Sequence, residues 1–124
     1  MSDERRARTN WPHDVPDAGE LVEAVRDYLA DDLGPRSEGR DRFLLRVAAN
    51  ALSIAARELA TGGADATAHA DRLATLGDGS DAQMAAALRD GSFDHRWSEF
   101  APVLWATTLA KQAVANPGYR DETA

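Results

Sequence analysis

The chain has 124 residues, enough for one domain with its own core, and 25 of them are alanines whereas only 6% of the residues are aromatic. Alanine is the best helix former and is depleted in strands, so this composition favours packed helices over a sheet. The net charge of −7 argues against a nucleic-acid binder, and the absence of cysteine excludes disulfides, thiolate nucleophiles and thiolate metal sites.

The start of the chain, residues 1–8, is polar and charged, and no apolar run of the kind found in secretory signals follows it. The longest apolar stretches are short and are interrupted by polar residues, which excludes a spanning helix. We therefore expect a cytoplasmic protein that binds no membrane. The basic residues are 13 arginines and a single lysine, Lys111, a bias that indicates a GC-rich genome.

The pattern predicts a flexible N-terminal arm over residues 1–15, one helical domain over 16–117 and a tail over 118–124. The first helix is expected to start near Pro16, with Asp17 as its cap and Glu20 completing a capping box. Gly34-Pro35 ends it. Its apolar stripe consists of Leu21, Val22, Val25, Tyr28, Leu29 and Leu33.

The second helix, from about 41 to 60, has the clearest helical period, and Phe43, Val47 and Ile54 define an apolar line along it. We expect Val47 and Ile54 to be fully buried, so that Ile54→Ala would cost about 2–5 kcal/mol. The run 61–63, Thr-Gly-Gly, is expected to stop this helix, and a third helix is expected over 66–76.

The turn Gly77-Asp78-Gly79 precedes a short fourth helix that Ser80 or Asp81 caps and that ends at Gly91. Asp94 is expected to cap the last segment. Pro102 either kinks that segment or lies in the first turn of a helix that begins near Ala101. Asn116-Pro117 ends it.

These elements predict an all-α bundle of about five helices. The second and last helices are expected to pack through the Phe43/Val47/Ile54 and Leu104/Val114 stripes. The last helix is apolar on two sides, with Trp105 on the second side. Such a helix either lies at the centre of the bundle or contacts another chain, which leaves a homodimer open.

Motifs for chemistry are absent from the sequence. The histidines His13, His69 and His95 have no metal-ligand spacing, and there is no HExxH, glycine-rich phosphate loop or nucleophile elbow. The segment 77–81 has turn residues but lacks the ordered carboxylates of a calcium loop. We expect no cofactor, no metal and no catalytic set, and hence no enzyme acting alone.

One group of polar residues interrupts the apolar faces. Asn50 lies within the Phe43/Val47/Ile54 line and Arg46 flanks it, while Lys111 borders the apolar face of the last helix. In one interpretation Asn50 ties two helices together, and Arg46 and Lys111 pair with acids such as Glu23 or Asp27. In the other, Arg46, Asn50 and Lys111 line a pocket for an anionic group.

Three segments carry a family resemblance. The run 40–52, RDRFLLRVAANAL, resembles the central signature of an uncharacterised bacterial family of small helical domains, G-R-x-x-F-x-x-R-V-A-A-N-A-L. The segments 20–29, ELVEAVRDYL, and 109–119, LAKQAVANPGY, are similar to the opening and closing patterns of that family, and the turn 91–94 also fits. Gln112 departs from the usual apolar residue.

The resemblance implies a companion of aminoglycoside-phosphotransferase-like kinases and acyl-CoA dehydrogenases, and it places Arg46, Asn50, Lys111 and Asn116 in a family pattern. The leading hypothesis is therefore a non-catalytic accessory or interaction domain that works with such a partner. The alternative is a small-molecule binder for an anionic, acyl or phosphorylated compound, which uses the same polar residues. A pocket lined by them would favour the binder, and a flat apolar patch would favour the partner.

Overall fold

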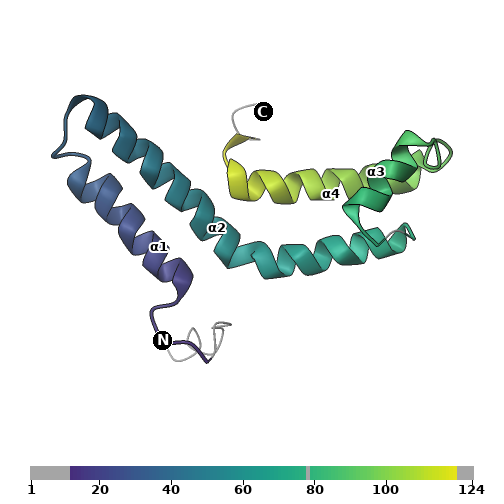
Figure 1. The fold of residues 1–124 in the computed structure, drawn as a ribbon, viewed down its shortest axis with the longest axis horizontal. Coiled ribbons are helices and arrows are strands. Elements are labelled where there is room, and N and C mark those ends of the chain that lie inside the picture. The colour runs from purple at the N-terminus through teal and green to yellow at the C-terminus, as the bar shows by residue number, and fades with distance from the viewer. Residues whose placement is uncertain (1–11, 78, 120–124) are drawn as a thin grey trace. The chain divides into compact units, whose positions relative to one another are not determined.

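The computed structural model describes residues 12–77 and 79–119, which contain four α-helices, a π-helical segment and no strand. The elements appear in Figure 1 and have these bounds: α1 Ala18–Asp27, η2 Tyr28–Leu33, α2 Gly39–Thr75, α3 Asp81–Arg89 and α4 Trp97–Ala115. The all-α prediction is confirmed, with four helices in place of about five. Most of the predicted arm, residues 1–11, and the end of the tail, 120–124, lie outside the described residues.

The chain divides between Leu59 and Ala60 into two compact units, and this boundary falls inside α2. Unit 1 comprises residues 1–59, and unit 2 comprises residues 60–124. Among the described residues, no helix has both the length and the apolar character needed to cross a membrane.

Local chemistry sets the ends of the first helix in unit 1. The Asp17 carboxylate accepts a hydrogen bond from the Glu20 backbone N–H at 2.8 Å, and the Glu20 carboxylate accepts one from the Asp17 backbone N–H at 3.2 Å, so the predicted capping box is confirmed. After Asp27 the helix widens into η2 and ends at Gly34, whose N–H donates to the Leu29 carbonyl at 2.9 Å.

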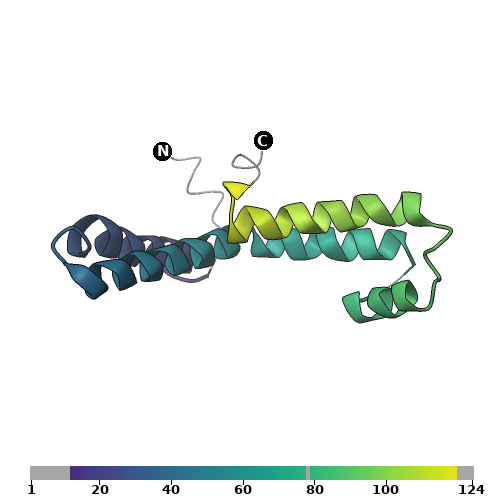
Figure 2. The same ribbon diagram turned by 90° about the horizontal axis from the view of Figure 1, so that it is seen from above.

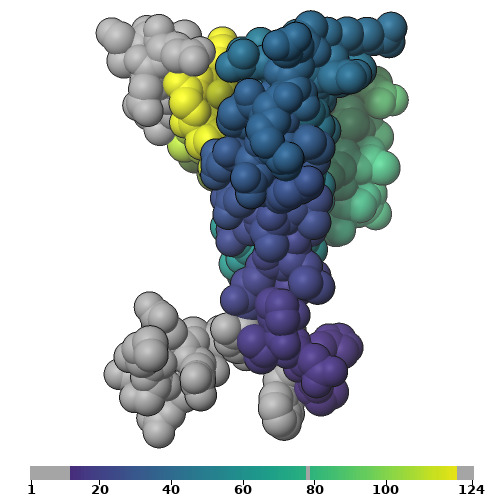
Figure 3. Space-filling model, turned by 90° about the vertical axis from the view of Figure 1, so that its left-hand side faces the viewer, coloured from purple at the N-terminus to yellow at the C-terminus, as the bar shows by residue number. Residues whose placement is uncertain are grey.

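Unit 1 is a hairpin in which α1 and the first part of α2 run in opposite directions (Figure 1). A Cβ built on Gly19 would lie 4.0 Å from the Leu59 Cβ, which places the start of α1 beside the end of this part of α2. Atoms of α1 and of the start of α2 adjoin one another in the space-filling view (Figure 3). The buried residues of the described part of unit 1 are small, so the two helices approach closely: Gly34, Ala49 and Ala56.

Unit 2 contains the main apolar core. The second part of α2 and α4 run side by side, as both Figure 1 and Figure 2 show, and α3 covers the end of this pair. Phe100 is 2% exposed, and its ring centroid lies 5.3 Å from that of Phe93. The buried cluster comprises Leu73, Leu76, Met84, Phe93, Phe100 and Val103.

The ends of α3 and α4 agree with the sequence prediction at three points and differ at one. Ser80 caps α3, because its hydroxyl accepts a hydrogen bond from the Gln83 N–H at 3.2 Å. Gly91 adopts a positive φ of 84° after α3, and α4 ends before Asn116-Pro117. The predicted Asp94 cap is wrong, because α4 begins at Trp97 without a side-chain cap, and Pro102 lies inside it.

The predicted stop at 61–63 is also wrong, since α2 continues through these residues for a total of 37 residues. Each glycine costs a helix about 1 kcal/mol relative to alanine, yet alanine-rich sequence on both sides supports the helix. Ending and restarting a helix would leave terminal N–H and C=O groups without helical partners. The predicted second and third helices are therefore one.

Gly63→Ala is expected to stabilise the protein by about 0.5–1 kcal/mol. Gly63 lies inside α2, and a Cβ built there meets no atom within 4 Å, so alanine adds helix propensity without a clash. Thermal and chemical unfolding of the two proteins would measure the gain. A variant less stable than the parent would show that the helix is interrupted at this point in solution.

Candidate functional site

Arg46 and Asn50 lie on the outside of unit 1. Both residues belong to α2, are exposed, and stand one turn apart on one face of the helix. Among the described residues no ion pair involves Arg46, and no hydrogen bond links Asn50 to another helix. Within unit 1, Asn50 therefore does not tie α2 to α1.

The apolar line that was expected to surround Asn50 is also not the core. Val47 is 50% exposed and Phe43 is exposed, while Ile54 is only partly buried. In the unit 1 part of α2 the buried residues are alanines, Ala49 and Ala56, and such small residues let a neighbouring helix approach closely. The prediction that Val47 and Ile54 are fully buried is therefore wrong.

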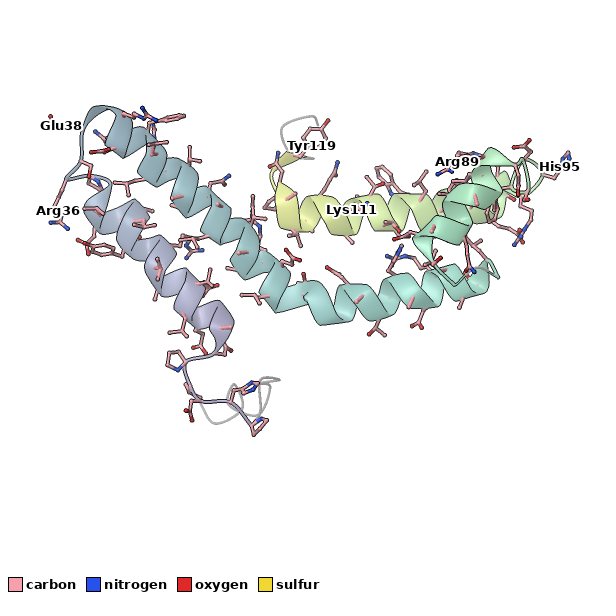
Figure 4. All side chains as sticks on the ribbon, in the orientation of Figure 1. Arg36, Glu38, Arg89, His95, Lys111 and Tyr119 are labelled. Atoms are coloured by element: carbon pink, nitrogen blue, oxygen red, sulfur yellow. The ribbon has the colours of Figure 1, made fainter. Side chains whose placement is uncertain are left out.

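Lys111 and Asn116 belong to unit 2, at the C-terminal end of α4. Lys111 is exposed, and Figure 4 labels it together with Tyr119. Asn116 is the exposed residue that ends the helix, where its backbone N–H donates to the Gln112 carbonyl at 2.8 Å. The four candidate residues are thus two pairs, one in each unit.

A different set of polar side chains meets in unit 2. His69 on α2 bonds through Nε2 to the Asp81 carboxylate of α3 at 2.7 Å, and the Thr107 hydroxyl of α4 lies 3.3 Å from its Nδ1. In the tautomer that carries the proton on Nε2, Nε2–H donates to the carboxylate and the Thr107 hydroxyl donates to Nδ1. One side chain thereby joins three helices.

No motif in the sequence predicts the His69/Asp81/Thr107 set. The residues stand 12 and 26 positions apart, and their meeting depends on how three helices pack. The only hint was that His69 follows Ala66 at helical spacing on the face that holds Leu73. Among residues 12–77 and 79–119, no group of three or more His, Asp or Glu side chains could hold a metal ion.

His69→Ala is expected to lower the free energy of unfolding by about 1 kcal/mol, because it removes two hydrogen bonds between helices. The effect stays modest since the Asp81 side chain is largely exposed. Urea unfolding would measure it, with His95→Ala as the control at an exposed histidine. If both variants lost the same free energy of unfolding, His69 would have no specific structural role.

The pKa values of Asp90 and Arg26 are shifted, and local hydrogen bonds explain both shifts. The pKa of Asp90 is lowered because the hydroxyl and backbone N–H of Ser92 donate to its carboxylate in the turn after α3. The pKa of Arg26 is raised because its guanidinium donates to the neighbouring Asp27. Both groups are exposed parts of a turn or a helix surface, and neither adjoins a candidate residue.

The outer side of α4 carries large apolar side chains within unit 2. Trp97 and Trp105 are 58% and 57% exposed, and Leu104 lies between them, half exposed. Trp97 and Leu104, seven residues apart, lie on one side of α4 next to buried Phe100, and Trp105 lies on the adjoining side, about 80° around the helix from Trp97. The Trp97 ring packs on Phe100 at 5.4 Å between centroids, so it is held in place. We call Trp97, Leu104 and Trp105 the tryptophan face.

Comparison with known proteins gives one match. Residues 35–119 match the model of a family described as "Domain of unknown function (DUF6285)". The matched range contains α2, α3 and α4 and includes all four candidate residues, whereas α1 precedes it. No curated protein and no solved structure matches the chain.

Proposed function

The chain belongs to the DUF6285 family, and we propose that it is a non-catalytic accessory domain that binds an enzyme partner through the tryptophan face of α4. The observation that carries this proposal is the exposure of Trp97 and Trp105 on adjoining sides of a single helix. Tryptophan is enriched among the residues that dominate binding energy, because a rigid ring offers much area at a small entropic cost. Exposed apolar patches of a few hundred Å² mark interaction sites.

The resemblance noted in the sequence supplies the class of partner, an aminoglycoside-phosphotransferase-like kinase or an acyl-CoA dehydrogenase. The face itself favours an apolar groove on the partner, since Lys111 is the single basic residue along α4 and Glu99 the single acidic one. Charged residues are depleted at the centres of protein interfaces.

The test is co-expression of the chain with a kinase-like or dehydrogenase protein encoded beside it, followed by a measurement of the dissociation constant. Trp97→Ser is expected to weaken binding at least about 30-fold, the effect of losing an interface hot spot. Leu88→Ser is the control, because Leu88 is an exposed apolar residue of unit 2 on α3. Failure of both enzymes to bind, or equal weakening by the control, would refute the proposal.

A second candidate function rests on Arg46 and Asn50, which stand exposed with Arg42 one turn before them. A guanidinium beside an amide can bind a phosphate or carboxylate group. Support for this anion site comes from the absence of an acidic partner for Arg46 among the described residues.

Lys111→Ala tests whether Lys111, in unit 2, takes part in anion binding. We expect this variant to be at least as stable as the parent, because Lys111 is exposed. We also expect it to lose part of the thermal shift that phosphate, coenzyme A or an acyl-phosphate analogue gives. Arg46→Ala is measured in parallel. If the variant were clearly less stable than the parent, and the ligands shifted the unfolding temperature of both proteins equally, Lys111 would have a structural role only.

A further inference from the structure

We propose that one side of unit 1 is a dimer interface that packs against the same side of a second copy of the chain. Among the described residues of this unit no large apolar side chain is buried, since the buried positions are a glycine and two alanines. A two-helix hairpin without a core needs another surface to cover it. Five large side chains, each 44–54% exposed, form what we call the hairpin face: Leu21, Val25, Tyr28, Leu44 and Leu59.

Two features put these side chains on one side of the hairpin. They are spaced at helical intervals, and α1 and the first part of α2 run in opposite directions. Leu21, Val25 and Tyr28 are four and three residues apart, so they share one face of α1. On α2, Leu44 and Leu59 lie in register with Ala48, Ala51 and Ala55. Because Gly19 lies beside Leu59, the α1 row and the α2 row lie on the same side of the contact between the two helices.

The other side of the hairpin is charged. Glu23 and Asp27 occupy it on α1, and Arg46 and Arg57 occupy it on α2. An apolar surface on one side alone pairs with its own copy and then stops, which gives a closed dimer instead of a filament.

The shape of the hairpin face fits a second copy. Its α1 row carries the large side chains Leu21, Val25 and Tyr28, whereas the middle of its α2 row carries the small ones, Ala51 and Ala55. A twofold axis along the helices places α1 of each copy on α2 of the other, so large side chains meet small ones at both contacts. All neighbouring helices are then antiparallel, as in a four-helix bundle.

The apolar area of the hairpin face approaches what a stable dimer needs. A half-exposed large apolar side chain offers on the order of 60–100 Å², so five of them offer roughly 300–500 Å². The alanine methyl groups between them add to this area, and a specific interface usually buries about 800 Å² per partner. A monomer rarely leaves a patch of this size uncovered.

Sedimentation equilibrium and light scattering on the full chain test the proposal. The expected mass is twice the 13.4 kDa of one chain. Ala51→Glu puts a charge into the hairpin face and is expected to raise the dissociation constant at least about tenfold. The matched control is Asn50→Glu, because Asn50 is the adjacent exposed residue on the far side of α2 and the charge change is the same. A chain that is monomeric at about 100 μM overturns the proposal and assigns the face to another protein or another part of the chain.

Cysteine cross-linking gives a second readout that does not depend on weakening the dimer. The chain contains no cysteine, so single replacements are unambiguous. A Val25→Cys chain mixed with an Ala51→Cys chain is expected to form a disulfide between the two chains under mild oxidation, because these positions face each other across the twofold axis. A mixture of Val25→Cys with Asn50→Cys is the control. Equal cross-linking in the two mixtures would overturn the arrangement.

Discussion

Phe100→Ala is expected to lower the free energy of unfolding by about 3–5 kcal/mol, the usual loss when a buried phenylalanine is truncated. Phe100 is 2% exposed and is the largest fully buried side chain among the described residues. Its ring packs between Phe93 and Trp97, at 5.3 and 5.4 Å between centroids. Alanine would leave a cavity at the centre of unit 2, because the surrounding helices cannot close around it.

Guanidinium unfolding followed by circular dichroism measures this loss. Phe43→Ala is the matched control, since it makes the same substitution at a phenylalanine that is 57% exposed. Surface truncations of this kind usually change stability by about 0.5 kcal/mol or less. If Phe43→Ala lowered the free energy of unfolding as much as Phe100→Ala does, the assignment of the main core to unit 2 would be wrong.

Helix ends were the part of the fold that sequence alone predicted best, because their chemistry is local. Asp17 with Glu20, and Ser80 before α3, cap helices by hydrogen bonds that span three residues. Proline after Asn116 ends α4 for an equally local reason. The glycine pair at 62 and 63 misled the prediction, since a glycine stops a helix only when the chain can turn away there.

Which face of α2 is buried could not be predicted, because the helix has two apolar faces. The line through Phe43 and Val47 is the more hydrophobic one, whereas the line through Ala49 and Ala56 packs on α1. The helical period identifies both lines equally well. The line of small residues is the buried one only because a neighbouring helix approaches it closely, and this approach depends on tertiary packing.

The candidate site was predicted in part. Arg46 and Asn50 do share one face, as their four-residue spacing indicates, but neither is buried. The His69/Asp81/Thr107 contact could not be found from spacing, because its three members come from three helices. Contacts of this kind depend on tertiary packing, which a single sequence does not determine.

Gly34→Ala is expected to destabilise the protein by about 1–3 kcal/mol. The wide turn of η2 brings the Leu29 carbonyl against Gly34, and a Cβ built on Gly34 would lie 2.8 Å from that oxygen and 3.3 Å from the Ala30 oxygen. Both oxygens belong to the backbone, which cannot move aside as a flexible side chain does. The φ of Gly34 is −57°, so the loss comes from this contact and not from a strained dihedral angle.

The same substitution at Gly63 makes the comparison sharp, because that glycine is helical too and meets no atom within 4 Å. Thermal unfolding of the two variants beside the parent is expected to give changes of opposite sign, a loss at Gly34 and a gain at Gly63. A gain at both positions would mean that α1 continues as an ordinary α-helix to its end, without the close approach of Leu29. A loss at both would mean that α2 is not continuous, whereas opposite signs support the widened end of α1 and the unbroken α2 together.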